Sequence, residues 1–181
     1  MKRIETRSGV TLIELLVVIV IIGVLMASLG FFYQGWMGRY NVESQIRQIY
    51  SDLMNARIKA MQNNRFQFLT FPNATSYTMY EDTNGNGTLQ TASDTQLAGF
   101  PKQLKYAFTW TGGVIPNDVI SFDMRGFVSS PGILANPNNS NYHDKIRINT
   151  TLNADYDCIC LSQTKISTGK WNATSSECDV K

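Results

Sequence analysis

The chain has 181 residues, 43% of them hydrophobic and 17% charged, which suits one folded domain with an appendage and excludes a disordered or highly charged protein. The first nine residues hold three of the 16 basic and one of the 14 acidic residues, so they account for the whole formal net charge of +2. The remaining body is neutral, and its charge gives no support for nucleic-acid binding.

The N-terminal segment combines a basic stretch, the pair Ser8-Gly9 and a long apolar run. The 19 residues from Leu15 to Tyr33 carry no charge, and a helix of this length can cross a bilayer. Because the basic residues precede the run, we expect Met1 in the cytoplasm and the body of the protein outside. The alternatives are a plain signal anchor and a secretory signal peptide cleaved near residues 27–30.

Glu14 lies at the start of this apolar segment. An ionisable side chain within a membrane span costs roughly 2.5–3.5 kcal/mol, so its presence there indicates a functional site. A carboxylate buried away from water also needs a partner of opposite charge. The alternative interpretation is that the Glu14 carboxylate lies among the lipid headgroups without a specific partner.

The stretch Ser8-Gly9-Val10-Thr11-Leu12-Ile13-Glu14-Leu15 resembles the cleavage motif of type IV prepilins and type II secretion pseudopilins. The resemblance implies that a membrane prepilin peptidase cuts between Gly9 and Val10 and N-methylates Val10. Glu14 then becomes the fifth mature residue, and the new Val10 amine, in the same or a neighbouring subunit, becomes its partner. This pairing would set the axial register during assembly. Val10 departs from the Phe that this family most often has there.

Beyond the apolar run, the sequence predicts that the helix continues to about residue 63. Six apolar residues recur every three or four positions and so share one helical face: Val42, Ile46, Ile49, Leu53, Ala56 and Ala60. Polar residues are expected on the other side: Arg47, Gln48, Asp52, Asn55 and Lys59. We expect Asn63-Asn64 to end the helix.

The rest of the chain predicts short strands separated by turns. The candidates are two aromatic-rich strands near residues 66–71 and 77–80, then Tyr106–Trp110, Val119–Phe122, Lys145–Ile148 and Cys158–Leu161. The expected fold is α+β: a long N-terminal helix packed against a C-terminal antiparallel β-sheet domain. We divide the chain into a leader removed on processing (1–9), a hydrophobic transmembrane or filament-core helix (10–38), its amphipathic half (39–63) and a β-rich domain (64–181).

Three further segments resemble the FimT/FimU/GspH-like minor pilins. They are Leu53–Asn64 at the helix end, Ile120–Phe127 at a strand and turn, and Cys158–Ser162 at the last predicted strand. The resemblance implies a minor pilin that helps initiate, prime or cap a type IV pilus. Its expected partners are other pilin subunits, the prepilin peptidase, the inner-membrane assembly platform and, before assembly, lipid. The alternatives are a type II secretion pseudopilin, a DNA-binding pilin for natural transformation, and a major pilin.

The three cysteines, Cys158, Cys160 and Cys178, lie in the last 24 residues. Their spacing lacks a Cys-x-x-Cys pair, so a disulfide in an oxidising compartment is favoured over a zinc site. Cys158 and Cys160 share a strand face, and alternation therefore leaves both as partners for Cys178. Family members whose last strand opens with Cys favour Cys158–Cys178, with Cys160 left as a small buried residue. Without such a bridge, the polar tail 164–181 is expected to fray.

One segment has the beginning of a calcium loop, because Asp82, Asn84 and Asn86 place oxygen ligands at alternate positions ahead of Gly87. The closing Glu is missing, so these residues are a weak calcium candidate and a strand-connecting turn is favoured.

No metal or cofactor is expected. His143 is expected in a surface loop, and no catalytic motif surrounds it, so we expect no enzymatic activity.

Lys165, Lys170 and Lys181 are weak candidates for phosphate contacts with DNA. Some DNA-binding relatives of the FimT type carry a Gly-Arg-x-Arg turn after the last strand. The corresponding stretch here, residues 164–170, contains no arginine. DNA is therefore a possible partner that the sequence does not favour.

Overall fold

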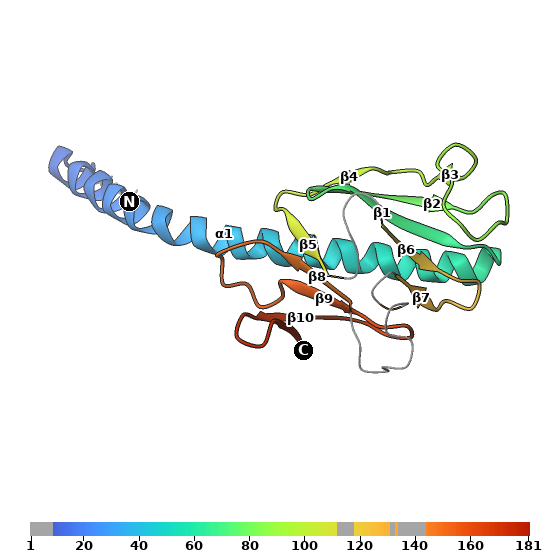
Figure 1. Cartoon of the computed structure of the whole chain (residues 1–181). Helices are drawn as coiled ribbons and strands as arrows, with labels where there is room; N and C mark the ends of the chain where they lie inside the picture. The colour runs from blue at the N-terminus through green and yellow to red at the C-terminus, as the bar shows by residue number, and fades with distance from the viewer. Residues whose placement is uncertain (1–8, 112–117, 131–132, 134–143) are drawn as a thin grey trace, which may run out of the picture. The chain divides into compact units, whose positions relative to one another are not determined.

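The computed structural model describes residues 9–111, 118–130, 133 and 144–181, without the side chains of residues 28–34. The chain separates into two compact units, Met1–Gly38 and Arg39–Lys181. Among the described residues the secondary structure comprises one long helix and short antiparallel strands. The expected α+β class, a long N-terminal helix followed by an antiparallel β-sheet domain, is confirmed (Figure 1).

Helix α1 extends from Leu12 to Asn63, as the spacing of apolar residues predicted. It ends where Asn64 takes a left-handed conformation, with φ of 52°, which asparagine tolerates better than most residues. The Arg65 amide then donates to the Ala60 carbonyl at 3.2 Å, the hydrogen bond of a Schellman motif. The predicted helix end at Asn63-Asn64 is therefore confirmed.

The strands form two antiparallel sheets in the second unit. The first has the order β3-β2-β1-β6-β7, with β4 also paired to β2, and the second has the order β11-β10-β9-β8-β5. The first sheet comprises β1 (Gln67–Asn73), β2 (Ser76–Glu81), β3 (Thr95–Gln96), β4 (Lys102–Gln103), β6 (Val119–Phe122) and β7 (Val128–Ser129). The second comprises β5 (Phe108–Trp110), β8 (Asp144–Ile148), β9 (Cys158–Leu161), β10 (Ile166–Asn172) and β11 (Glu177–Val180).

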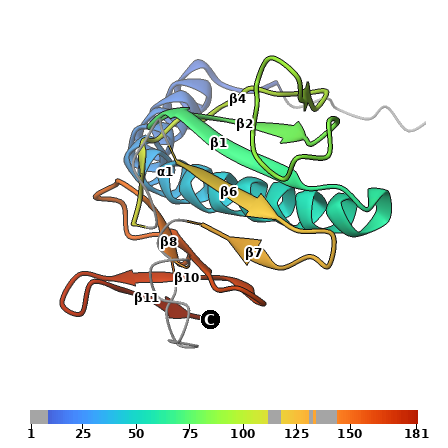
Figure 2. The same ribbon diagram turned by 45° about the vertical axis from the view of Figure 1, so that its right-hand side comes forward.

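The C-terminal half of α1 packs against both sheets and forms one hydrophobic core with them. All six residues of the predicted apolar stripe, Val42 to Ala60, are 0–1% exposed. Inward-facing residues such as Ile120 and Phe122 on β6, and Ile146 on β8, belong to the same cluster. Figures 1 and 2 show β1 and β6 on one side of this half of the helix and β8 to β10 on another.

Asp52 was predicted on the polar, outward side of the helix, but it is only 8% exposed, so this part of the prediction is wrong. Its carboxylate accepts a hydrogen bond from the Tyr77 hydroxyl at 2.6 Å and lies 2.6 Å from the Lys102 ammonium. Burial, together with the hydrogen bond to Asp52, raises the pKa of Tyr77 far above its usual value. The phenol therefore stays protonated and can act as the donor that joins β2 to α1.

The tail 164–181, expected to fray only without a disulfide, carries the bridge Cys158–Cys178 and forms two strands that the sequence did not predict. Residues Ile166–Asn172 and Glu177–Val180 form the hairpin β10–β11, which continues the second sheet beyond β9. Pairing with β9 supplies the order that the composition of the tail does not indicate.

Candidate functional site

Gly9 and Val10 lie immediately before α1, and Glu14 lies in its first turn. The Thr11 side-chain oxygen accepts a hydrogen bond from the Glu14 amide at 3.3 Å, and the Leu15 amide donates to the Thr11 carbonyl at 3.2 Å. Thr11 is therefore the N-cap of the helix. Our sequence reasoning overlooked Thr11, although the Thr-x-x-Glu spacing of a capping box is present in the sequence.

The first unit exposes an unusual amount of apolar side chain. Val10 is 73% exposed, and from Leu12 to Met26 every large hydrophobic residue is at least 45% exposed. Monomeric soluble proteins rarely expose contiguous apolar surface of this extent. Glu14 is the one charged side chain between residues 10 and 27, all of which the structure describes.

Among the described residues, no helix reaches the length and mean hydropathy that a membrane span requires.

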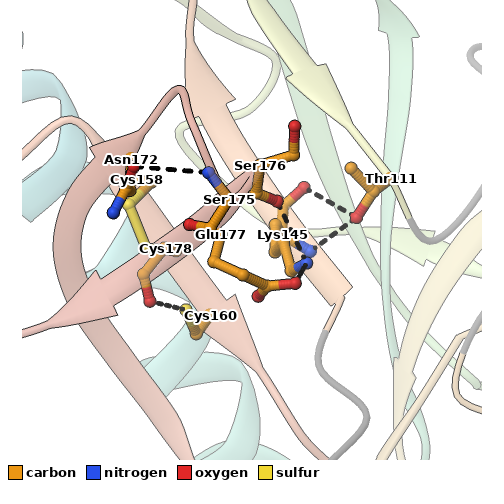
Figure 3. Close-up of polar contacts among 9 residues, drawn as sticks. All are labelled: Thr111, Lys145, Cys158, Cys160, Asn172, Ser175, Ser176, Glu177 and Cys178. Carbon is orange, nitrogen blue, oxygen red and sulfur yellow. Dashed lines mark hydrogen bonds and ion pairs between the residues drawn. A yellow bond between two sulfur atoms is a disulfide. The ribbon is translucent and has the colours of Figure 1, made fainter.

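At the other end of the chain, a disulfide joins Cys158 on β9 to Cys178 on β11 across the intervening strand β10 (Figure 3). The two Cα atoms are 6.0 Å apart, whereas strands two positions apart in a flat sheet lie about 9.6 Å apart. Strand β11 therefore curls toward the face of the sheet that carries the cysteines. Cys160 remains a free, buried thiol that donates to the Cys178 carbonyl at 3.2 Å.

Gly169 allows this close approach of β11. A Cβ atom at Gly169 would lie 2.3 Å from the Asp179 carbonyl oxygen and 3.1 Å from the Cys178 sulfur, so no other residue fits without a shift of β11. The curl also brings Glu177 to Lys145 on β8, with 2.6 Å between the carboxylate oxygen and the ammonium nitrogen (Figure 3). The disulfide and this ion pair together fix the C-terminal hairpin on the sheet.

Comparison with known families finds a match for the N-terminal segment. Residues 6–30 match the family model described as the prokaryotic N-terminal methylation motif. The chain carries a prepilin-type N-terminus. This motif supports a type IV pilin or pseudopilin, and Gly9, Val10 and Glu14 all lie within the matched residues. No curated protein and no solved structure matches the chain.

The disulfide is the pair that the family resemblance favoured, Cys158–Cys178, rather than Cys160–Cys178. Burial raises the pKa of the Cys160 thiol to about 11. At neutral pH the thiol is therefore protonated and a poor nucleophile. Cys160 thus has the role of a small buried side chain beside the bridge.

The three candidate DNA-contact lysines are not brought together by the structure. Lys170 donates to the Asn153 side chain, and Lys181 lies 3.7 Å from the Asp155 carboxylate. Lys165 lies in the β9–β10 turn, about 17 Å from Lys170 along an extended strand. Two of the three cations therefore contact the same loop, and the third is distant from them. DNA contact by these residues stays a prediction.

The calcium candidates serve as acceptors in a turn. The Asp82 carboxylate accepts hydrogen bonds from the Gly85 amide at 2.6 Å and the Gly87 amide at 2.8 Å. The Asn84 and Asn86 side-chain oxygens each accept an amide two residues further along. Among the described residues, no group of three or more His, Cys, Asp or Glu side chains is arranged to hold a metal ion. His143 lies outside the described residues.

Proposed function

We propose that this chain is a minor pilin that helps to initiate, prime or cap a type IV pilus. The observation that carries the proposal is the methylation motif at residues 6–30, followed by a capped helix whose apolar side chains are exposed. In this proposal a prepilin peptidase cuts between Gly9 and Val10 and methylates the Val10 amine. The chain then leaves the membrane and joins other subunits through the N-terminal helix.

The exposed apolar side chains of the helix suit two successive environments, lipid and then a filament. Before assembly, lipid covers these side chains, with the N-terminus in the cytoplasm and the C-terminal domain in the periplasm. After assembly, the helices of other pilin subunits cover them at the pilus and cell surface. The inner-membrane assembly platform transfers the subunit between the two. The apolar side chains are the same in both, so the transfer exchanges one apolar partner for another.

The assignment to minor pilins rests on two segments that meet in the structure. The turn after β6 places Gly126 against the end of α1, where a Cβ atom would lie 2.9 Å from the Met61 sulfur and 3.2 Å from Arg57 Cγ. Gly126 belongs to the segment Ile120–Phe127, and Met61 to Leu53–Asn64. The two segments that resemble the FimT/FimU/GspH-like pilins are therefore parts of one packing contact, which supports a shared origin of both resemblances.

Mass spectrometry of the protein from its native membrane tests the processing step. The expected product begins at an N-methylated Val10 and lacks residues 1–9. Gly9→Leu is expected to retain the leader, because the bulky side chain blocks the cleavage position. The control variant Ser8→Ala should be processed normally. A product that begins near Leu29 would contradict the proposal and indicate conventional signal cleavage.

Copy number tests the minor role. Quantitative mass spectrometry of sheared pili is expected to find a few copies of this chain per filament, and deletion of its gene should reduce the number of pili. A dominant filament band would instead identify a major pilin. Normal piliation together with loss of protein secretion on deletion would identify a type II secretion pseudopilin.

A further inference from the structure

Arg147 on β8 is a cation without a counter-charge in the described part of the chain. Its guanidinium lies over the ring of Trp171, with 4.7 Å between the guanidinium carbon and the ring centroid. The Nε atom is buried, and no hydrogen bond from the described residues reaches it. The Trp171 ring fixes the plane of the guanidinium, as a cation–π contact does. The charge is therefore oriented but not neutralised.

Arg147 lines an open pocket of about 520 Å³, together with Tyr106, Asn149, Thr150, Thr151 and Leu152. This volume is within the usual range of small-ligand sites. The pocket wall is held in place by α1, since the Gln45 side chain donates to the Tyr106 carbonyl at 2.7 Å and accepts from the Tyr106 amide at 3.0 Å. The Asn149 backbone amide donates to the Ala107 carbonyl at 2.7 Å, which ties Asn149 to the residue after Tyr106.

The other polar groups of the pocket are neutral. The Asn149 side-chain oxygen accepts from Thr109, and the Thr150 hydroxyl accepts from the Leu152 amide. The Asn149 side-chain nitrogen (Nδ2) and the Thr151 hydroxyl form no hydrogen bond with any residue that the structure describes. A ligand therefore meets one charged lining residue, Arg147, and at least two free hydrogen-bonding groups without charge. A second cation is close by, since the Lys105 ammonium lies 5.8 Å from the centroid of the Tyr106 ring.

We propose that this pocket binds the carboxylate of a hydroxyl-rich ligand, and that a uronic acid unit of an acidic saccharide is the class that fits. The planar guanidinium presents parallel N–H donors that match a carboxylate. A single cation balances the one charge of a carboxylate, whereas a phosphate at neutral pH carries nearly two. The Asn149 side-chain amide and the Thr151 hydroxyl then hydrogen-bond to sugar hydroxyls.

The test uses the full chain in a non-ionic detergent, with glucuronate, glucose and inorganic phosphate as probes. Glucuronate is expected to shift the backbone amide NMR signals of Arg147, Asn149 and Thr151 saturably, and glucose should bind at least about tenfold more weakly because it lacks the charge-assisted hydrogen bonds. Arg147→Gln should weaken glucuronate binding by a similar factor. Arg147→Lys keeps the charge and loses the planar guanidinium, so its affinity for glucuronate should lie between those of the native chain and Arg147→Gln.

Two further variants distinguish a loss of binding from misfolding of the domain. Thr151→Val alters an exposed side chain and should weaken glucuronate binding with an otherwise unchanged spectrum. Arg125→Gln removes an exposed cation that is paired to Asp123 in the turn after β6, and it should leave binding unchanged. Equal affinity for phosphate and glucuronate, or glucuronate binding that survives Arg147→Gln, would overturn the proposal.

Discussion

At the scale of single residues, Gly126 is the position where backbone conformation and packing both exclude a side chain. Its φ of 80° is strained for any L-residue, and Met61 and Arg57 fill the space where a Cβ would lie. Gly126→Ala is expected to lower the free energy of unfolding by about 1–3 kcal/mol, measured by urea denaturation of the full chain.

Gly85 provides the matched control, because its φ of 74° is similar and the space around its Cβ position is open. Gly85→Ala therefore has the backbone strain without the steric conflict and should be the milder change. Equal losses in the two variants would show that the contact with α1 contributes nothing beyond the backbone conformation.

Asp123 makes the same turn sensitive to pH. Burial alone would raise the pKa of its carboxyl, but hydrogen bonds from the Phe127 amide at 2.8 Å and from Arg125 outweigh burial and hold the pKa below its usual value. A lowered folded-state pKa means that the stabilisation is complete above the unfolded pKa of about 3.9 and is lost as the pH falls through the folded value.

Asp123→Asn is therefore expected to lower the free energy of unfolding by about 1 kcal/mol at pH 7, and the difference should shrink as the pH falls below the unfolded pKa of about 3.9. Denaturation at the two pH values measures this effect. Asp155→Asn is the control, because the Asp155 side chain forms an exposed ion pair with Lys181 and such pairs contribute little. A loss for Asp123→Asn that is the same at both pH values would assign the effect to packing instead.

At the scale of elements, the helix was predictable and the C-terminal hairpin was not. The stripe from Val42 to Ala60 repeats at helical spacing, so its burial could be read from local sequence alone. Strands such as β3, β4 and β7 are two residues long and exist only through their partners in the sheet. No window of sequence holds that information.

The same reasoning explains which site residues sequence could supply. Gly9, Val10 and Glu14 form a contiguous motif. Asp52 looked like a surface residue because its cover, Tyr77 and Lys102, comes from distant strands. Two cysteines on one strand face are equivalent in sequence. The structure distinguishes them through β10, which pairs Cys158 with Gly169 and so leaves room for the bridge to Cys178.

The bridged hairpin predicts the reactivity of the cysteines. In the folded, unreduced protein at pH 8, iodoacetamide is expected to label no cysteine, because Cys160 is buried and burial raises its pKa to about 11. After denaturation without reductant, one thiol per chain should react, and peptide mapping should place the label on Cys160. Three reactive thiols would exclude the disulfide, and a label on Cys158 would indicate the other pairing.

At the scale of the whole molecule, the two units differ in what covers their apolar residues. The unit Arg39–Lys181 buries its own core between helix and sheets, so it supplies its own stability. In the unit Met1–Gly38, the large hydrophobic side chains described from Val10 to Met26 are exposed, so another apolar surface has to cover them. Under the proposed function, assembly acts on the first unit, and variants in it are expected to change filament formation more than the stability of the second.

Glu14 tests this division, and two variants separate its possible roles. It occupies the N3 position after the Thr11 cap, where either Glu or Gln can complete a capping box. Glu14→Gln therefore keeps the cap and removes the charge, whereas Glu14→Val removes both.

If the Glu14 charge pairs with the Val10 amine of a subunit, both variants should insert into membranes normally. Both should enter filaments at least about tenfold less than the native chain, since loss of one partner leaves an unpaired buried charge. Quantitative mass spectrometry of membranes and sheared pili measures both steps. Normal filament entry by Glu14→Gln together with failure by Glu14→Val would assign Glu14 to capping rather than to subunit pairing.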